Sequence, residues 1–289
     1  MSDFNPRILR RILELRQFPL LATGDLDELA SLADNLVERT FPAGTLLASA
    51  GSRIDALHLI LDGSIETRPR GQAWGPRQVF GALEVFADRP MLGSAVAGTE
   101  VHTLQLSAGN IGEVLEDNFS ILLATLRELA TRLLAASHPH PHGAIVGTRD
   151  PLGLVERLIL LRTQVPFAAA RLQALATLAH ASDEVSWPAG TTVARSGEPA
   201  TCGLVIIDGT VQARRGGSCR ELGPGAPLGH LESIAGLHHT ATVEATSDVR
   251  VLRSPVSAIL DVLEDHADVG LAMIGTFAAA LIDSAKELN

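Results

Sequence analysis

Histidines and carboxylates that could do chemistry gather between residues 229 and 243. This stretch, GHLESIAGLHHTATV, places His230 and Glu232 a few residues before the pair His238-His239. Imidazole and carboxylate groups can ligate a metal or act as general acid and base, and a protonated imidazole can bind an anion. No nucleophile–base pair and no metal-ligand spacing stands out elsewhere in the chain, so we expect a binding site rather than an enzyme.

A second group of histidines alternates with proline in the sequence SHPHPHG, residues 137–143, which contains His138, His140 and His142. Proline cannot continue a helix, and this alternation does not bring the imidazoles to one coordination shell. No cysteine or acidic residue follows until Asp150. We interpret the segment as a linker and expect no metal site in the chain.

The elements that would position the first group belong to an internal repeat. Residues 42–68 and 188–214 align without a gap, with ten of 27 positions identical. Farther along, FGALE at 80–84 matches LGHLE at 228–232, now with two additional residues in between, which most simply lengthen a hairpin loop. A period this long makes each copy a whole domain. We expect a first domain at 1–137, a linker at 138–151 and a second domain at 152–289.

Each copy changes its hydrophobic pattern in the same order. Helical spacing of apolar residues marks 4–17 and the segment after Asp25, and short apolar runs broken by Asp-Gly and Pro-Ala-Gly turns fill 36–107. Helical spacing then returns at 109–136. The second half repeats the order, with a roll at about 183–255. The expected fold class is mainly β with flanking helices (α+β), as two tandem β-rolls.

Composition limits the possible partners. The 289 residues carry a formal net charge of −10 and are 46% hydrophobic, which describes a globular chain that binds nucleic acid or anionic lipid poorly. The two cysteines suggest no disulfide framework, and the N-terminus lacks a signal-peptide core. The longest apolar run, 270–282, is shorter than the ~20 residues that span a bilayer. We expect a cytoplasmic protein with no membrane span.

The glycine framework of both copies resembles the cyclic nucleotide-binding domain family. The shared features are the helix starts at Phe80-Gly81 and Leu228-Gly229, the Asp-Gly turns, and the segments Ser94-Ala95-Val96 and Ala241-Thr242-Val243. The resemblance covers nearly the whole chain as two tandem copies, as in the regulatory subunits of cyclic-nucleotide-dependent kinases. It implies a regulatory protein rather than an enzyme.

In that family a short helix points backbone N–H groups at the cyclic phosphate, an Arg binds the phosphate and a Glu binds the ribose. The resemblance makes the candidate ligand-binding residues of the second copy Gly229, His230, Leu231, Glu232, His239, Thr240 and Thr242. The degenerate equivalents in the first copy are Gly81, Ala82, Leu83, Glu84, Leu92 and Ser94.

Both copies lack the two charged groups of the family. Counted back from Val96, Leu92 stands in the Arg position of the first copy and Ala82 in the Glu position; in the second copy these are His239 and His230. Each lost charge-assisted hydrogen bond is worth about 1.5–3 kcal/mol. We therefore expect no ordinary cyclic nucleotide binding in the first copy, and possible nucleotide or anion binding in the second, favoured at low pH.

Two features of the sequence have two alternative interpretations each. Glu84 and Glu232 lie two residues past the family's Glu; each is either a displaced ribose acceptor or an acid that complements a helix N-terminus. The closing helix 267–287 is apolar on nearly every face, so it is buried on its own roll or also covers a partner, including a second subunit.

The expected function is that of a regulatory protein that binds a partner protein, with ligand control through the second copy. The alternative is a ligand-independent interaction module with vestigial pockets. About 33 residues follow the second roll, and we expect closing helices there rather than a DNA-binding domain.

Overall fold

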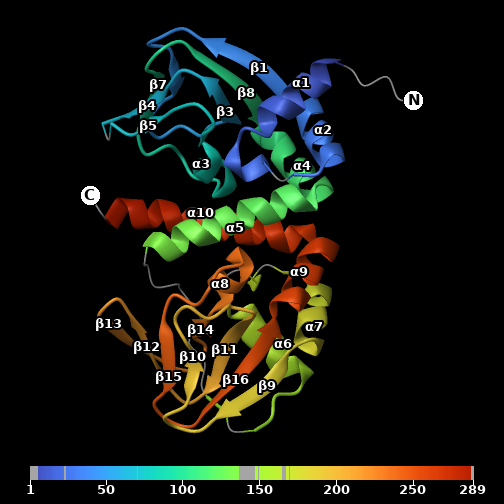
Figure 1. Cartoon of the computed structure of the whole chain (residues 1–289), viewed down its shortest axis with the longest axis vertical. Helices are drawn as coiled ribbons and strands as arrows, with labels where there is room; N and C mark the ends of the chain where they lie inside the picture. Colours follow the sequence, from blue (N-terminus) through green and yellow to red (C-terminus); the bar gives the residue numbers. More distant parts are fainter. Residues whose placement is uncertain are drawn as a thin grey trace. The chain divides into compact units, whose positions relative to one another are not determined.

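The computed structural model describes residues 6–22, 24–69, 71–136, 147–148, 150–164, 167–168 and 170–287 (Figure 1). The chain forms two compact units, Met1–Thr125 together with Phe277–Asn289, and Leu126–Thr276. We keep "first copy" and "second copy" for the sequence repeats 1–137 and 152–289. The expected linker histidines lie outside the described residues, and the linker bounds stay a prediction.

The first roll consists of two four-stranded antiparallel sheets in the orders β1-β8-β3-β6 and β2-β7-β4-β5. Its strands are β1 (Leu36–Phe41), β2 (Leu46–Ala48), β3 (Ala56–Asp62), β4 (Ile65–Arg68), β5 (Ala73–Trp74), β6 (Val79–Phe80), β7 (Ser94–Ala97) and β8 (Val101–Ser107). The helices around it are α1 (Pro6–Leu15), η1 (Pro19–Leu21), α2 (Leu26–Asp34), α3 (Ala82–Phe86), η2 (Ala108–Asn110), α4 (Ile111–Asp117) and α5 (Phe119–Ala136).

The second roll repeats this arrangement, with sheets in the orders β14-β11-β16-β9 and β10-β15-β12-β13. Its strands are β9 (Asp183–Trp187), β10 (Thr192–Ala194), β11 (Cys202–Asp208), β12 (Val211–Arg215), β13 (Ser218–Leu222), β14 (Pro227–Leu228), β15 (Thr242–Ala245) and β16 (Val249–Pro255). The helices are α6 (Leu154–Arg162), α7 (Leu172–His180), α8 (His230–Ala235), α9 (Val256–Asp265) and α10 (Ala267–Glu287). The expected tandem β-roll fold is confirmed.

The glycines of the repeat are required by the backbone. Gly63 and Gly209 follow the Asp of the Asp-Gly turns at φ 84°, and a Cβ on either would lie 2.1 Å from the carbonyl oxygen of Glu100 or Asp248. No side chain fits there, which is why both turns use glycine.

The two additional residues of the second copy lie in one hairpin, as expected. In the first copy β4 pairs with β5 over Ile65↔Trp74 and Glu66↔Ala73. In the second copy the β12–β13 ladder continues to Arg215↔Ser218 around a Gly216-Gly217 turn. This longer hairpin brings additional side chains to the edge of the second roll.

Helix α10 ends the described chain. Residues Ala267–Lys286 are long and apolar enough to cross a membrane by length and composition, with 44% of the apolar window buried in the protein. Core helices of soluble proteins pass the same test, so no membrane insertion follows from this property. This span is longer than the 13-residue apolar run counted from the sequence because it also includes Ala267-Asp268-Val269 before the run and Asp283-Ser284-Ala285-Lys286 after it.

Candidate functional site

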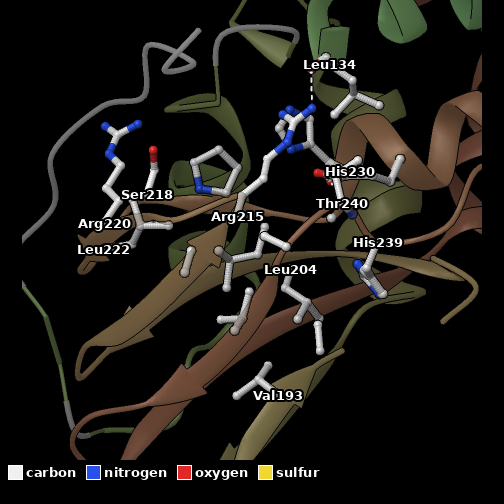
Figure 2. Close-up of a pocket in the computed structure, with 18 of the residues that line it drawn as sticks. Leu134, Val193, Leu204, Arg215, Ser218, Arg220, Leu222, His230, His239 and Thr240 are labelled. Atoms are coloured by element: carbon white, nitrogen blue, oxygen red, sulfur yellow. Dashed lines mark hydrogen bonds between the residues drawn. The ribbon is translucent and has the colours of Figure 1, made fainter. Parts of the chain in front are cut away.

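The second roll contains a partly open cavity of about 490 Å³, shown in Figure 2. Apolar walls come from the strands, and polar groups lie at the helix α8 corner and on the β12–β13 hairpin. The lining residues that carry the site are Leu204, Leu222, Arg215, Arg220, His230 and His239, with Gly229, Glu232 and Thr240 beside them. Pockets of this size and mixed lining are typical of small-molecule sites.

The structure brings most of the candidate residues together at the start of α8. Gly229 is the left-handed N-cap at φ 68°, matching Gly81 at φ 85° before α3. His239 lies against it: a Cβ on Gly229 would be 3.0 Å from the imidazole Cε1. His230 also lines the cavity, whereas Leu231 is 1% exposed and belongs to the core.

Glu232 is held by Thr240 across this corner. The Thr240 hydroxyl donates to Glu232 Oε1 at 2.7 Å, and the Thr240 backbone N–H lies 3.4 Å from the same oxygen. Both residues line the cavity. The carboxylate therefore ties the loop after α8 to the helix. A hydrogen-bond donor on a ligand would have to share this carboxylate with Thr240.

Thr242 lies outside the cavity lining and does a structural task. Its hydroxyl accepts the backbone N–H of Ser196 at 3.2 Å, as the Ser94 hydroxyl accepts that of Ala50 at 3.1 Å in the first copy. These matched bonds join β15 and β7 to the loop after the neighbouring strand. They identify Ser94 with Thr242.

Two cavity arginines were missed by the reasoning from the cassette, Arg215 and Arg220 on the β12–β13 hairpin. Alternation of side chains along a strand points every second residue to one face. The buried Val211 therefore predicts that Ala213 and Arg215 face inward, and the pairing Ala213↔Arg220 carries this to β13. This pattern in the sequence could have found both.

Bulky apolar side chains pack into the interior of the first roll. Its core contains Ile54, Ile60, Phe80 and Met91, with Trp74 packed against them. The Trp74 and Phe80 rings meet edge to face, with centroids 5.2 Å apart. At the helix start a Cβ on Gly81 would be 2.7 Å from Ile54 Cδ1, so an apolar side chain occupies the corner taken by His239 in the second roll.

The structure corrects the equivalence of Leu92 with His239. Gly51 donates to the Met91 carbonyl at 2.9 Å and Gly197 to that of His239 at 3.0 Å, so Met91 is the counterpart of His239. Counting back from Val96 failed because Val96 pairs in the sheet as Glu244 does, not as Val243 does. Met91 is 4% exposed in the core, and Leu92, the counterpart of Thr240, is 38% exposed.

The remaining candidates of the first copy lie on α3. Ala82 lines a small apolar cavity of about 90 Å³ under the helices, together with Phe18, Leu57 and Leu59. Leu83 and Glu84 are half-buried in the first turn of α3. Among the residues that the structure describes, neither an acid nor a cation therefore lies in the roll interior beside Gly81.

A buried histidine in the first roll was also missed. His58 is 4% exposed between the rings of Phe41 and Phe80, each 5.8 Å away between centroids. Burial lowers the pKa of His58 to about 4, with a smaller opposing effect of Asp55. The Gln105 side-chain amide donates to His58 Nδ1 at 3.2 Å, which requires a neutral ring nitrogen there.

Metal binding finds no support in the described part of the chain, where no three histidine, cysteine or acidic side chains gather as a metal site would require. The histidines of residues 137–143 are outside that part. His230 and His239 are therefore considered as cavity-lining groups.

Comparison with curated proteins finds regulatory relatives. A cAMP-dependent protein kinase regulatory subunit of Aspergillus niger is 29% identical over 139 residues, which cover 46% of this chain and 32% of that protein. A CRP-like cAMP-activated global transcriptional regulator of Mycobacterium tuberculosis is 29% identical over 113 residues, 36% of this chain and 50% of the regulator. The matched segments thus span about a third to a half of these relatives.

Among solved structures, the regulatory subunit of a cAMP-independent protein kinase A from Trypanosoma brucei is 17% identical, with a TM-score of 0.37, covering 93% of this chain and 91% of that one. The N-terminal domain of a transcriptional regulator from Streptomyces coelicolor is 26% identical over 43% of this chain and 93% of its own, with a TM-score of 0.39. The family model described as cyclic nucleotide-binding domain matches residues 38–118 and 184–266, together more than half of the chain. The chain therefore belongs to the cyclic nucleotide-binding domain family, with two tandem copies of the domain.

Proposed function

We propose that this chain is a non-catalytic cytoplasmic regulatory protein whose second copy binds an anionic small ligand and whose output is the binding of a partner protein. The observation that carries the proposal is the contrast between the rolls. The second contains a cavity lined by the helix α8 corner and two arginines, whereas aromatic side chains fill the first.

The charges around the cavity favour an anion. Arg215 and Arg220 carry positive charge at the hairpin, and His230 and His239 bring imidazole groups to the α8 corner. Glu232, the acid among the lining residues, already accepts hydrogen bonds from Thr240. A phosphate-bearing ligand such as a nucleotide fits this balance better than a cation.

The ligand test uses the full chain and its His239→Arg variant against cyclic mono- and dinucleotides, by calorimetry at pH 8 and pH 6. We expect wild-type affinity to rise at pH 6, because an imidazole gains charge as the pH falls. We expect His239→Arg to bind more tightly at both values, since arginine keeps its charge. His238→Arg, which adds the same charge at an exposed neighbour outside the cavity lining, serves as the control and should bind as wild type does.

Absence of binding by wild type and His239→Arg at both pH values would contradict ligand control for this panel. The alternative, a ligand-independent interaction module with vestigial pockets, would then be favoured. We expect the first copy to bind no nucleotide more tightly than about 100 μM. A second, tighter site that Met91→Lys or Phe80→Trp alters would contradict this expectation.

Partner binding is supported by matched exposed apolar residues on the helices of both copies. Leu9, Leu13 and Leu26 are 47%, 57% and 47% exposed. Their repeat counterparts Val155, Ile159 and Leu172 are 62%, 60% and 61% exposed. In the proposal, the matched set on one copy or the other makes the apolar contact with the partner protein. The second candidate contact is a homodimer through the apolar helix 267–287.

The partner test is co-purification of the tagged chain from its own host with Leu13→Glu, Ile159→Glu and the double variant. We expect a specific protein to be lost in at least one single variant, while thermal unfolding stays unchanged because these side chains are exposed. Glu116→Gln on the exposed face of α4 is the control. A partner retained by the double variant would move the contact elsewhere.

A further inference from the structure

Arg215 stands on the inner face of the hairpin, and its neighbour Arg214 on the outer face. Arg215 lines the cavity, whereas Arg214 donates to Gln212 Oε1 at 2.6 Å and pairs with Glu244 at 3.6 Å. Strand alternation is the reason for the opposite directions. Two arginines in succession therefore have different environments, which makes one a control for the other.

Arg215 also reaches the end of helix α5. Its Nη2 donates to the Leu134 carbonyl at 2.9 Å, drawn as a dashed line in Figure 2. The last four carbonyls of a helix have no partner within the helix, so this bond satisfies one of them. Leu134 itself lines the cavity and is 8% exposed. The end of α5 thus forms part of the cavity wall.

A second arginine attaches the same stretch of α5 to the ligand corner. Arg127, two turns before Leu134, lies with its Nε 3.4 Å from the carbonyl oxygen of Ile234 in α8. Residues 126–136 belong to the same compact unit as the second roll. The segment is therefore joined to the roll at both the hairpin and helix α8, with the cavity in between.

The guanidinium of Arg215 keeps donors available for a ligand. Arginine has five N–H groups in a planar fork, and the bond to Leu134 uses one of them. No carboxylate forms an ion pair with Arg215 among the described residues, so its charge is not neutralised there. Arg220 lies on the adjacent strand and lines the same cavity. This end of the cavity carries the two arginines, whereas the α8 corner carries imidazole groups and the Glu232 carboxylate.

We propose that Arg215, with Arg220, binds the anionic group of the ligand while it holds Leu134, so that occupancy clamps the end of α5 onto the second roll. The inference rests on the proposed function. It adds two details, the position of the ligand's charged group in the cavity and the helix that responds to binding. The counterparts in the first copy are Pro69 and Gln72, so neither of these two matched positions is basic there.

The binding test compares Arg215→Gln with Arg214→Gln in the full chain. The probes are cyclic AMP, cyclic GMP and cyclic di-GMP, with adenosine and guanosine as uncharged counterparts. We expect Arg215→Gln to weaken the phosphate-bearing probes by about 10- to 100-fold, because a charge-assisted bond is lost, and to leave the nucleosides unchanged. Arg214→Gln should match wild type.

The clamp is tested by amide hydrogen exchange of residues 126–136 with the tightest of these probes. Exchange should slow on binding in wild type and Arg214→Gln, and stay unchanged in Arg215→Gln. Faster exchange on binding would show that the ligand takes the guanidinium from Leu134, which overturns the clamp.

The outcomes separate this inference from the proposed function. Wild-type affinity in Arg215→Gln would overturn the inference and leave ligand binding in place. Binding of none of the probes to wild type would overturn both. Thermal unfolding of each variant identifies a folding defect. If Arg215→Gln has one, Arg215→Lys provides the binding comparison, because it keeps the positive charge but loses the planar fork of donors.

Discussion

The two rolls have matching strand orders and differ in what fills them. Positions that hold Leu204, Leu222 and Leu228 in the second roll hold an imidazole, an indole and a phenyl ring in the first, His58, Trp74 and Phe80. The first interior is packed by these rings, and the second keeps a cavity of about 490 Å³. Side-chain volume on a shared backbone is enough to convert a pocket into a core.

Cavity-lining positions that carry histidine or arginine in the second roll carry uncharged residues in the first. Met91, counterpart of His239, is buried in apolar surroundings, and Pro69 and Gln72 stand where the second copy has Arg215 and Arg220. A cation buried in the first roll would lack compensation. In the first copy, packing of the interior by rings thus occurs together with the loss of the cations at these matched positions.

The largest expected effect comes from opening the filled roll. Phe80→Ala should lower the free energy of unfolding by about 3–5 kcal/mol, because it leaves a void among buried rings. Leu228→Ala, at the matching position, should cost about 2 kcal/mol, since Leu228 already borders a cavity. Urea unfolding of both variants measures the difference. Equal losses would mean that the two interiors are packed alike.

Acid should destabilise the first roll through His58. The unfolded chain takes up a proton near the ordinary pKa of 6.5, but the folded chain does so near 4. The free energy of unfolding is therefore fully present above pH 6.5 and falls as the pH drops toward 4, by up to about 3 kcal/mol. His58→Leu, which copies Leu204, should remove this part of the pH dependence.

Urea unfolding of wild type and His58→Leu at pH 7 and pH 4.5 makes the comparison. His102→Leu is the control, since His102 is partly exposed. If wild type and His58→Leu lose the same stability between the two pH values, His58 is protonated in the folded protein and its burial does not exclude charge.

The smallest effect is expected at the loop that follows each short helix. Thr240→Val removes the hydroxyl that donates to Glu232 and should cost about 1 kcal/mol, reduced from a fully buried charged bond by partial exposure. Leu92→Val at the matching position removes no hydrogen bond and should change stability by less than about 0.5 kcal/mol. Thermal unfolding at matched pH distinguishes the two variants. An equal change in stability would show that the hydrogen bond between Thr240 and Glu232 does not hold the loop.

Most of the fold could be predicted from the sequence because its signals are local or repeated. Asp62-Gly63 and Asp208-Gly209 specify tight turns that admit no side chain, and the 146-residue repeat makes each copy support the other. The change of spacing also located the longer hairpin. Within the site, Gly229, His230, Glu232, His239 and Thr240 were predicted and all line the cavity.

The features that the sequence did not predict depend on distances between segments that are far apart in the chain. The Leu92 assignment failed by one residue because a register is fixed by interstrand hydrogen bonds, which a count along the sequence does not contain. That Trp74 meets Phe80, or that Arg215 reaches Leu134 across 81 residues, follows from packing of the roll. The sequence by itself determined two β-rolls with incomplete family cassettes. Only the tertiary structure decided that the second roll contains a cavity while aromatic side chains pack the first, because a cavity is the volume left after side chains from many strands have packed.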